Sequence, residues 1–277
     1  MLPTERMTES SPVDPRSRPG DKDLLRDALR DQADRGRTKF DIVLLSVQRL
    51  LHRGAITNLA KMLGRMHQAD VAQVIMHLSS PKEKREVFEL VRGEAKRGQV
   101  LSELDSDSIN QVLADLLHAD IAWLIKDLGP DDAAYLLGVL PEERAKEILS
   151  LMRAEDSTEV ADLLKYPKDT AGGIMTTEFF ALPEDATAQD AIRRLQLATE
   201  AEMVFYIYVT DKDERLDGVL SLRQLLTVPP ATPLRSIATR DVISVTVDMD
   251  QEEVARQVAS YNLLAIPVID KIGRAHV

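Results

Sequence analysis

The chain has 277 residues, of which 44% are hydrophobic and 29% are charged, and its formal net charge is −11. Proteins that bind nucleic acids usually have a basic face, so this acidic balance argues against that class. The same balance is compatible with divalent cations, which prefer carboxylate oxygens as ligands. The chain has no cysteine, which excludes disulfides, thiolate zinc sites and cysteine nucleophiles.

The first 20 residues are rich in serine, proline and charged residues, and they lack the apolar core of a signal peptide. We expect residues 1–20 to be a disordered lead-in. Nowhere does the sequence contain an apolar stretch that approaches the ~20 residues needed to cross a bilayer. The sequence therefore predicts no membrane span within the chain.

Residues 21–165 have the pattern of short helices, with no convincing strand. Phe40–Leu51 is strongly apolar, and the later segment Ala69–Ala72 recurs as Ala119–Ala122 and, more loosely, as Asp131–Ala134. Helices of about ten residues cannot each bury a face alone, so they must stack into a superhelical array. We therefore predict an all-α superhelical domain over residues 21–165.

Residues 166–228 show the order strand, helix, strand, strand, short helix. Thr187–Asp190 has the pattern of a helix start, with Thr187 as the N-cap. Met203–Val209 is a nearly unbroken apolar run; a short buried helix could look the same, but its β-branched and aromatic content favours a strand. Gly218–Leu220 predicts the next strand, and Ser221 is expected to cap the helix that follows.

A second copy of this pattern occupies residues 229–277. The tripeptide Ile174–Thr176 recurs 63 positions later as Ile237–Thr239. A strand, a capping-box-like helix start and a buried strand are then predicted at Val242–Val247, Asp250–Glu253 and Leu264–Ile269. A repeat of this length indicates two related structural units.

The second copy is incomplete, because one more strand and a closing helix would be needed after Asp270. Gly273 fits a turn, but Ala275 and His276 stand where apolar strand residues are expected. Ile272–Val277 also matches the translation of a widely used sequencing-adapter DNA. We therefore expect the natural gene to continue beyond Val277.

The element order resembles a CBS motif, and the segment Ala171–Thr176 is similar to the cytosolic regulatory half of MgtE-type magnesium transporters. That family has a helical domain immediately before a CBS pair, so the resemblance covers roughly Phe40–Asp270. It implies an all-α superhelical domain followed by a CBS tandem whose second motif is truncated. The paired motifs are expected to share one core.

The resemblance also implies Mg²⁺ sites at which carboxylates of the helical domain and of the CBS pair face one another. Tyr135 and Asn262 stand where the family has further carboxylates. From the residues alone, the candidate acids could equally be helix N-terminal charges that the helix dipole favours. The candidate metal ligands are Asp131 and Glu252, with the adjacent Asp132 and Glu253 as substitutes.

CBS tandems often bind adenine nucleotides such as ATP, and four positions match the family's nucleotide site: Tyr206, Ser221, Arg223 and Gln224. Tyr206 would stack on the base, Ser221 would supply a hydroxyl, and Arg223 would meet phosphate. Gln224 replaces the acid that would hold the ribose hydroxyls. The alternative is that Tyr206 is a core residue and that Arg223 lies on the surface.

No histidine pair, glycine-rich phosphate loop or nucleophile motif is present, so we predict that the chain is not an enzyme. The resemblance implies a Mg²⁺-sensing regulatory region that gates an MgtE-like transporter at the cytoplasmic face of the cell membrane. Its implied partners are a transmembrane pore in cis and a second copy bound through the CBS pair. The alternative function is a stand-alone soluble CBS module that binds an adenine nucleotide.

Overall fold

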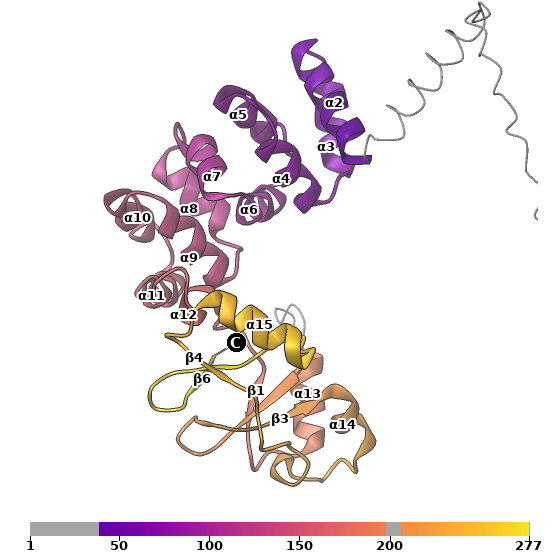
Figure 1. Cartoon of the computed structure of the whole chain (residues 1–277), viewed down its shortest axis with the longest axis vertical. Coiled ribbons are helices and arrows are strands. Elements are labelled where there is room, and N and C mark those ends of the chain that lie inside the picture. Colours follow the sequence, from indigo (N-terminus) through magenta and orange to yellow (C-terminus); the bar gives the residue numbers. More distant parts are fainter. Residues whose placement is uncertain (1–38, 198–205, 277) are drawn as a thin grey trace, which may run out of the picture.

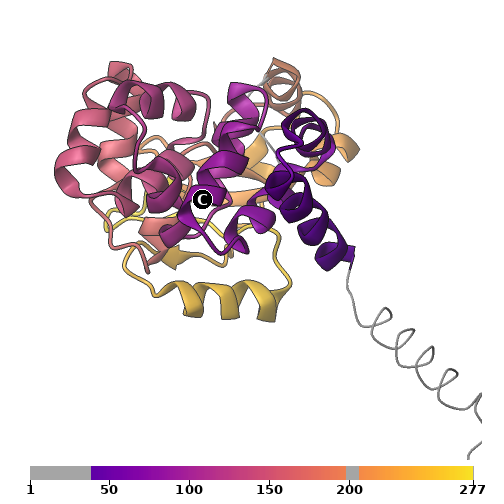
Figure 2. The same cartoon turned by 90° about the horizontal axis from the view of Figure 1, so that it is seen from above.

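The computed structural model describes residues 39–197 and 206–276. A curved stack of short helices, called here the helical region (α2–α11), occupies one end of the molecule, and two small sheets with their helices occupy the other (Figure 1). The view from above shows the curvature of the stack (Figure 2). This architecture is the predicted superhelix followed by a pair of α/β units.

The helical region consists of short helices, each packed against the helix two positions further along, from the α4–α6 contact to the α9–α11 contact. This stacking buries one face of every helix, as expected for helices too short to be stable alone. The helices are α2 (Lys39–His52), α3 (Ile56–Arg65), α4 (Gln68–Met76), α5 (Pro81–Glu89), α6 (Glu94–Ser102), α7 (Ser106–Leu113), α8 (His118–Ile125), α9 (Pro130–Val139), α10 (Glu142–Leu149) and α11 (Ala154–Leu163).

The repeated sequence motif corresponds to a repeated pattern of burial. In α4, α8 and α9 the two residues after the aspartate are buried, the next residue is exposed, and the following two are buried again. The exposed position holds Gln73, Trp123 and Tyr135 in the three copies. The packing of the superhelix therefore fixes four positions of each copy and leaves this fifth position free to vary.

Polar side chains connect distant turns of the superhelix by capping helix ends. Lys96 donates from Nζ to the carbonyl oxygen of Leu63 (3.0 Å), and Arg144 donates from Nη2 to that of Leu113 (2.6 Å). These carbonyls lie in the last turns of α3 and α7, where backbone oxygens lack partners within the helix and a cation interacts favourably with the dipole.

The first CBS motif begins with α12 (Ala171–Ile174) and contains a three-stranded sheet in the order β1-β2-β3. β1 is parallel to β2, and β2 is antiparallel to β3. The remaining bounds are β1 (Ala181–Pro183), α13 (Ala188–Leu197), β2 (Tyr206–Thr210), β3 (Leu216–Ser221) and α14 (Leu222–Thr227). These elements confirm the predicted order; Met203–Phe205, at the start of the predicted strand, lies outside the described residues.

The second CBS motif repeats this topology, with β4 parallel to β5 and β5 antiparallel to β6. Its elements are η1 (Leu234–Ser236), β4 (Val245–Thr246), α15 (Gln251–Tyr261), β5 (Val268–Ile269) and β6 (Ala275–His276). From the sequence no third strand was expected here, but the two residues of β6 pair with β5.

Both predicted strands of the second motif are longer than the strands observed. Val242–Ser244 and Leu264–Pro267 lie outside β4 and β5, and the β4–β5 and β5–β6 ladders are each only two residue pairs long. Leu264 was expected in a buried strand, yet it is 67% exposed. A short ladder fixes few residues, so the apolar run does not continue as a buried strand.

The leading segment of each motif is bonded to the other motif. The N–H of Ala171, at the start of the first motif, donates to the carbonyl of Met249 in the second (2.7 Å). The N–H of Leu234, at the start of the second motif, donates to the carbonyl of Ala186 in the first (2.8 Å). The two donors are 63 positions apart in the sequence, and so are the two acceptors. The repeat seen in the sequence is therefore also a repeat of tertiary contacts.

The buried residues of the CBS pair fall into two clusters rather than the one expected core, and each cluster also takes in residues of the other motif: Leu234 in one, Ala171 and Met175 in the other. Leu182, Ile207 and Leu220 of the first motif belong to a separate cluster of buried residues. Val245 and Val268 of the second motif belong to the cluster that runs through the helical region. The reason is geometric, because α12 contacts both α9 and α15 and so joins the second motif to the superhelix (Figure 1).

Candidate cation and nucleotide sites

The predicted acid on the helical region lies at its junction with the CBS pair. Asp131 stands in the first turn of α9, and the hydroxyl of Thr176 donates to its Oδ1 over a long distance of 3.4 Å. A Cβ added at Gly129 would lie 2.8 Å from Asp131 Oδ1 and 3.8 Å from Glu178 Oε2. Two carboxylates from the two parts of the chain therefore flank this glycine.

Glu178 was missed by the sequence analysis. The available signal was its place two residues after Thr176, in the segment that leads from α12 to β1. Its backbone N–H donates to the Thr176 hydroxyl (3.2 Å), so the same threonine connects this segment to Asp131.

The other predicted metal ligands occupy two helix starts. Asp132 is half-buried in the first turn of α9, whereas Glu252 and Glu253 are exposed in the first turn of α15. Asp250 caps α15 by accepting the N–H of Glu252 at Oδ1 (2.8 Å). Within the described residues, no group of three or more acidic or histidine side chains is arranged to hold a metal ion.

The two positions that depart from the family's acids have structural roles. Tyr135 donates its hydroxyl to the carbonyl of Leu104 (3.0 Å), which connects α9 to the turn after α6. Asn262 ends α15 in the left-handed conformation with φ 50°, a backbone geometry that asparagine tolerates better than most residues. Neither residue supplies a carboxylate at the junction.

Two of the predicted nucleotide residues form a capping box at the start of α14. Gln224 Oε1 accepts both the N–H and the hydroxyl of Ser221, each at 2.8 Å, and Ser221 Oγ accepts the N–H of Gln224 (3.3 Å). This geometry confirms that Ser221 caps the helix. Arg223 is exposed beside it, and Tyr206 is half-buried at the start of β2.

Two buried hydroxyls of the first motif have no hydrogen-bond partner among the described residues. They are Thr177 Oγ1 and Tyr208 Oη. Burial raises the pKa of Tyr208 to about 12, so its hydroxyl remains a neutral donor at physiological pH. A buried polar atom without a partner is unfavourable, and a bound ligand could supply the missing hydrogen bond.

The structure thus defines a class of protein in which an all-α superhelix is followed by a CBS pair, with acidic side chains where the two parts meet. The sequence matches the family model of the MgtE intracellular N domain over residues 66–169 and that of the CBS domain over residues 171–231 and 234–276. Because these matches cover both parts of the chain, it belongs to the family of MgtE magnesium transporter cytosolic regions.

Solved structures of the same architecture cover most of the chain. The cytosolic domain of the Mg²⁺ channel MgtE in complex with ATP is 33% identical, with a TM-score of 0.73 over 84% of this chain and 94% of that chain. The soluble part of a magnesium transporter is 28% identical, with a TM-score of 0.69 over 86% of this chain and 93% of that chain.

Curated magnesium transporters are similar over part of their length. MgtE of Thermus thermophilus is 45% identical over 111 residues, which are 40% of this chain and 25% of that protein. MgtE of Enterococcus faecalis is 43% identical over 108 residues, 39% of this chain and 24% of that protein. The chain thus aligns with about a quarter of each relative. Among its described residues, none of the helices has the length and apolar character needed to cross a membrane.

Proposed function

We propose that this chain is the Mg²⁺-sensing regulatory region of an MgtE-like transporter, placed at the cytoplasmic face of the membrane and joined in cis to a transmembrane pore. The observation that carries this proposal is the position of Asp131, whose carboxylate meets the Thr176–Glu178 segment of the CBS pair. Acidic groups from two parts of one chain repel each other unless a cation lies between them.

The mechanism is a cation-dependent population shift. Without Mg²⁺ the acidic faces repel and the helical region separates from the CBS pair; with Mg²⁺ the compact arrangement is favoured and the pore closes. The ion shifts the equilibrium only by its differential affinity for the two arrangements. Asp131 and Asp132 would bind the ion from the helical region and Glu178 from the CBS pair, and Glu252 and Glu253 would act from the start of α15.

Binding should be weak, because few carboxylates are available and Mg²⁺ would keep several of its waters. Because Tyr135 and Asn262 stand where the family has carboxylates, the junction lacks two ligands and also part of the repulsion that an ion would relieve. We expect millimolar affinity, equivalent to about 4 kcal/mol.

Limited proteolysis in a Mg²⁺ titration tests this function. Compaction should protect the linker around Tyr166–Thr170 in the wild type at millimolar Mg²⁺. Asp131→Asn combined with Glu252→Gln should abolish that protection without loss of helix content. Asp70→Asn is the matched control, because Asp70 is an exposed acid in the first turn of α4, at the repeat position that Asp120 also occupies.

The proposal fails if millimolar Mg²⁺ changes neither the cleavage rate nor the radius of gyration of the wild type. It also fails if Asp70→Asn removes the protection as fully as the double variant does. The measurement is best repeated on a chain extended beyond Val277, so that a longer second motif is compared with this one.

A second candidate function is regulation by an adenine nucleotide, either within the transporter or in a stand-alone CBS module. The buried hydroxyls of Thr177 and Tyr208 favour it, because a ligand in the first motif could satisfy them. A carboxylate holds ribose hydroxyls more strongly than an amide, since charge-assisted hydrogen bonds are stronger. Gln224→Asp should therefore tighten ATP binding several-fold in calorimetry; unchanged or weaker binding would reject the role assigned to Gln224.

We also propose that the CBS pair mediates a homodimer. Its surface carries exposed leucines, among them Leu226 (64%) on α14 and Leu264 after α15. Sedimentation equilibrium should show a dimer that Leu226→Asp weakens, whereas a monomer at all concentrations would contradict the proposal.

A further inference from the structure

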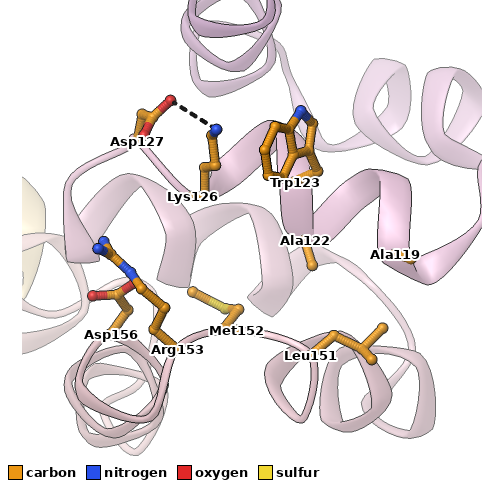
Figure 3. Close-up of a pocket in the computed structure, with 9 residues that line it drawn as sticks. All are labelled: Ala119, Ala122, Trp123, Lys126, Asp127, Leu151, Met152, Arg153 and Asp156. Atoms are coloured by element: carbon orange, nitrogen blue, oxygen red, sulfur yellow. Dashed lines mark hydrogen bonds and ion pairs between the residues drawn. The ribbon is translucent and has the colours of Figure 1, made fainter.

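A surface pocket of about 460 Å³ lies in the helical region, between α8 and the turn that joins α10 to α11 (Figure 3). None of its lining residues is a predicted metal or nucleotide ligand, and the nearest such residues in the sequence are Asp131 and Asp132 of α9. Its volume is in the range of sites that bind small molecules. The lining residues are Ala119, Ala122, Trp123, Lys126, Asp127, Leu151, Met152, Arg153 and Asp156.

Trp123 is the most informative residue of the pocket. It is 53% exposed and occupies the outward position of the repeat, where the other copies have Gln73 and Tyr135. Tyr135 uses that position for a hydrogen bond to the turn after α6, whereas the indole of Trp123 lies half-exposed with the Lys126 ammonium over its ring. A half-exposed tryptophan beside a hollow is typical of a contact surface rather than of a core.

The hollow itself comes from small residues. Ala119 and Ala122 lie on the face of α8 that turns toward Leu151 and Met152, and Figure 3 shows these apolar side chains gathered on one side of the pocket. Leu151 is 54% exposed, so the wall opposite the alanines is apolar and accessible. This side suits a flat or branched apolar group.

The other side of the pocket is charged. Arg153 donates from Nε to Asp156 Oδ2 (2.7 Å), which leaves the guanidinium's two terminal nitrogens to bind another acceptor. Lys126 lies over the Trp123 ring, 3.3 Å from its centroid, and is 3.9 Å from the carboxylate of Asp127. Each cation is thus paired with an acid and keeps further N–H donors with which it could bind an anion.

We propose that this pocket binds a small anionic ligand with a flat apolar body, such as an aromatic carboxylate or sulfonate. The apolar body would lie between Trp123 and Leu151 over the two alanines, and the anionic group would bind Arg153 and Lys126. The site is independent of the proposed magnesium function, since none of its residues is at the junction with the CBS pair.

The experiment uses the whole chain and its own fluorescence, because Trp123 is the single tryptophan of the sequence. The probe is 8-anilinonaphthalene-1-sulfonate, which has a flat apolar body and one anionic group. Binding should quench Trp123 emission by energy transfer, with saturation at one probe per chain. Arg153→Gln should weaken binding roughly tenfold, because it removes charge-assisted hydrogen bonds, and Ala119→Leu should weaken it at least as much by filling the hollow.

Two controls separate this site from general adsorption of the probe. Lys146→Gln removes an exposed cation of α10 that does not line the pocket, and it should leave the affinity unchanged. N-phenyl-1-naphthylamine, the uncharged analogue, should bind at least tenfold more weakly than the sulfonate. The proposal is overturned if Arg153→Gln and Ala119→Leu bind like the wild type, if Lys146→Gln weakens binding equally, or if the uncharged analogue binds as well.

Discussion

In the first CBS motif, Leu182 and Leu220 are buried in a cluster that contains no residue of the helical region. In the second motif, Val245 and Val268 are buried in the same cluster as the superhelix. The two motifs share a topology and a repeat of 63 positions, yet only the second has strand residues in the cluster that runs through the helical region. Sequence repeats therefore mark related folds, while the division of the core follows which helices come into contact.

The largest effect is expected at Gly173, in the α12 segment that joins the superhelix to the second motif. A Cβ there would lie 2.1 Å from the carbonyl oxygen of Pro167, which is backbone and cannot move aside easily. Gly173→Ala should lower the free energy of unfolding by on the order of 4 kcal/mol, measured by denaturant unfolding. Gly64→Ala, in α3 with nothing near its added Cβ, should instead stabilise slightly.

If Gly173→Ala were as stable as the wild type while Gly64→Ala lost stability, the close approach of the Pro167 carbonyl to Gly173 would be contradicted. Because both glycines are helical, helix propensity alone predicts that both alanine variants gain stability, by roughly 0.5–1 kcal/mol each. Only the contact with Pro167 makes the two signs differ.

A core substitution tests the division of the core directly. Leu136 is fully buried in α9, and Leu136→Ala should cost roughly 3 kcal/mol. Hydrogen exchange should then accelerate at the amides of Val245 and Val247 in the second motif, more than at Tyr208 in the first. Ile207 is fully buried in the first motif, and Ile207→Ala should accelerate exchange at Tyr208 more than at Val245 and Val247. Equal acceleration in both motifs would show that they open as one unit.

A smaller effect is expected from the loss of the one hydrogen bond that the Tyr135 side chain makes between α9 and the turn after α6. Tyr135→Phe removes the donor to the Leu104 carbonyl, and it should cost about 1 kcal/mol of stability. Tyr261→Phe is the matched control, since that tyrosine is exposed on α15. If both variants unfold at the same midpoint as the wild type, the Tyr135 bond does not stabilise the stack.

The smallest effect concerns two equivalent turns, one in each motif. In the first, the backbone N–H of Arg215 holds the pKa of Asp211 below its usual value, with help from Asp213. In the second, burial raises the pKa of Asp270, but the N–H and guanidinium of Arg274 outweigh it and the net shift is downward.

Because both folded pKa values are lowered, these carboxylates stabilise the fold above the unfolded pKa of about 4, and the stabilisation is lost as pH falls through the folded pKa. Thermal unfolding between about pH 5 and pH 2 should therefore show a shallower acid decline in Asp211→Asn and Asp270→Asn than in the wild type. An identical decline in the Asn variants would contradict the assignment.

The local elements and their repetition could be predicted from the order of residues alone. Thr187 caps α13 and Ser221 caps α14 as predicted, because a hydroxyl or carboxylate three residues from its partner N–H is a local arrangement. The helices of the superhelix and the 63-residue repeat were visible for the same reason, since hydrophobic periodicity and turn residues act over a few positions.

Which distant residues come into contact could not be predicted in this way, because it depends on how whole helices pack. The contact of Asp131 with Thr176, with Glu178 nearby, depends on how α9 approaches the segment after α12, and no local pattern encodes that approach. The same holds for Trp123, whose exposed position became a pocket wall only because the turn containing Leu151 lies opposite it. Such contacts join residues tens of positions apart, so they follow from the packing of whole helices rather than from the spacing of residues along the chain.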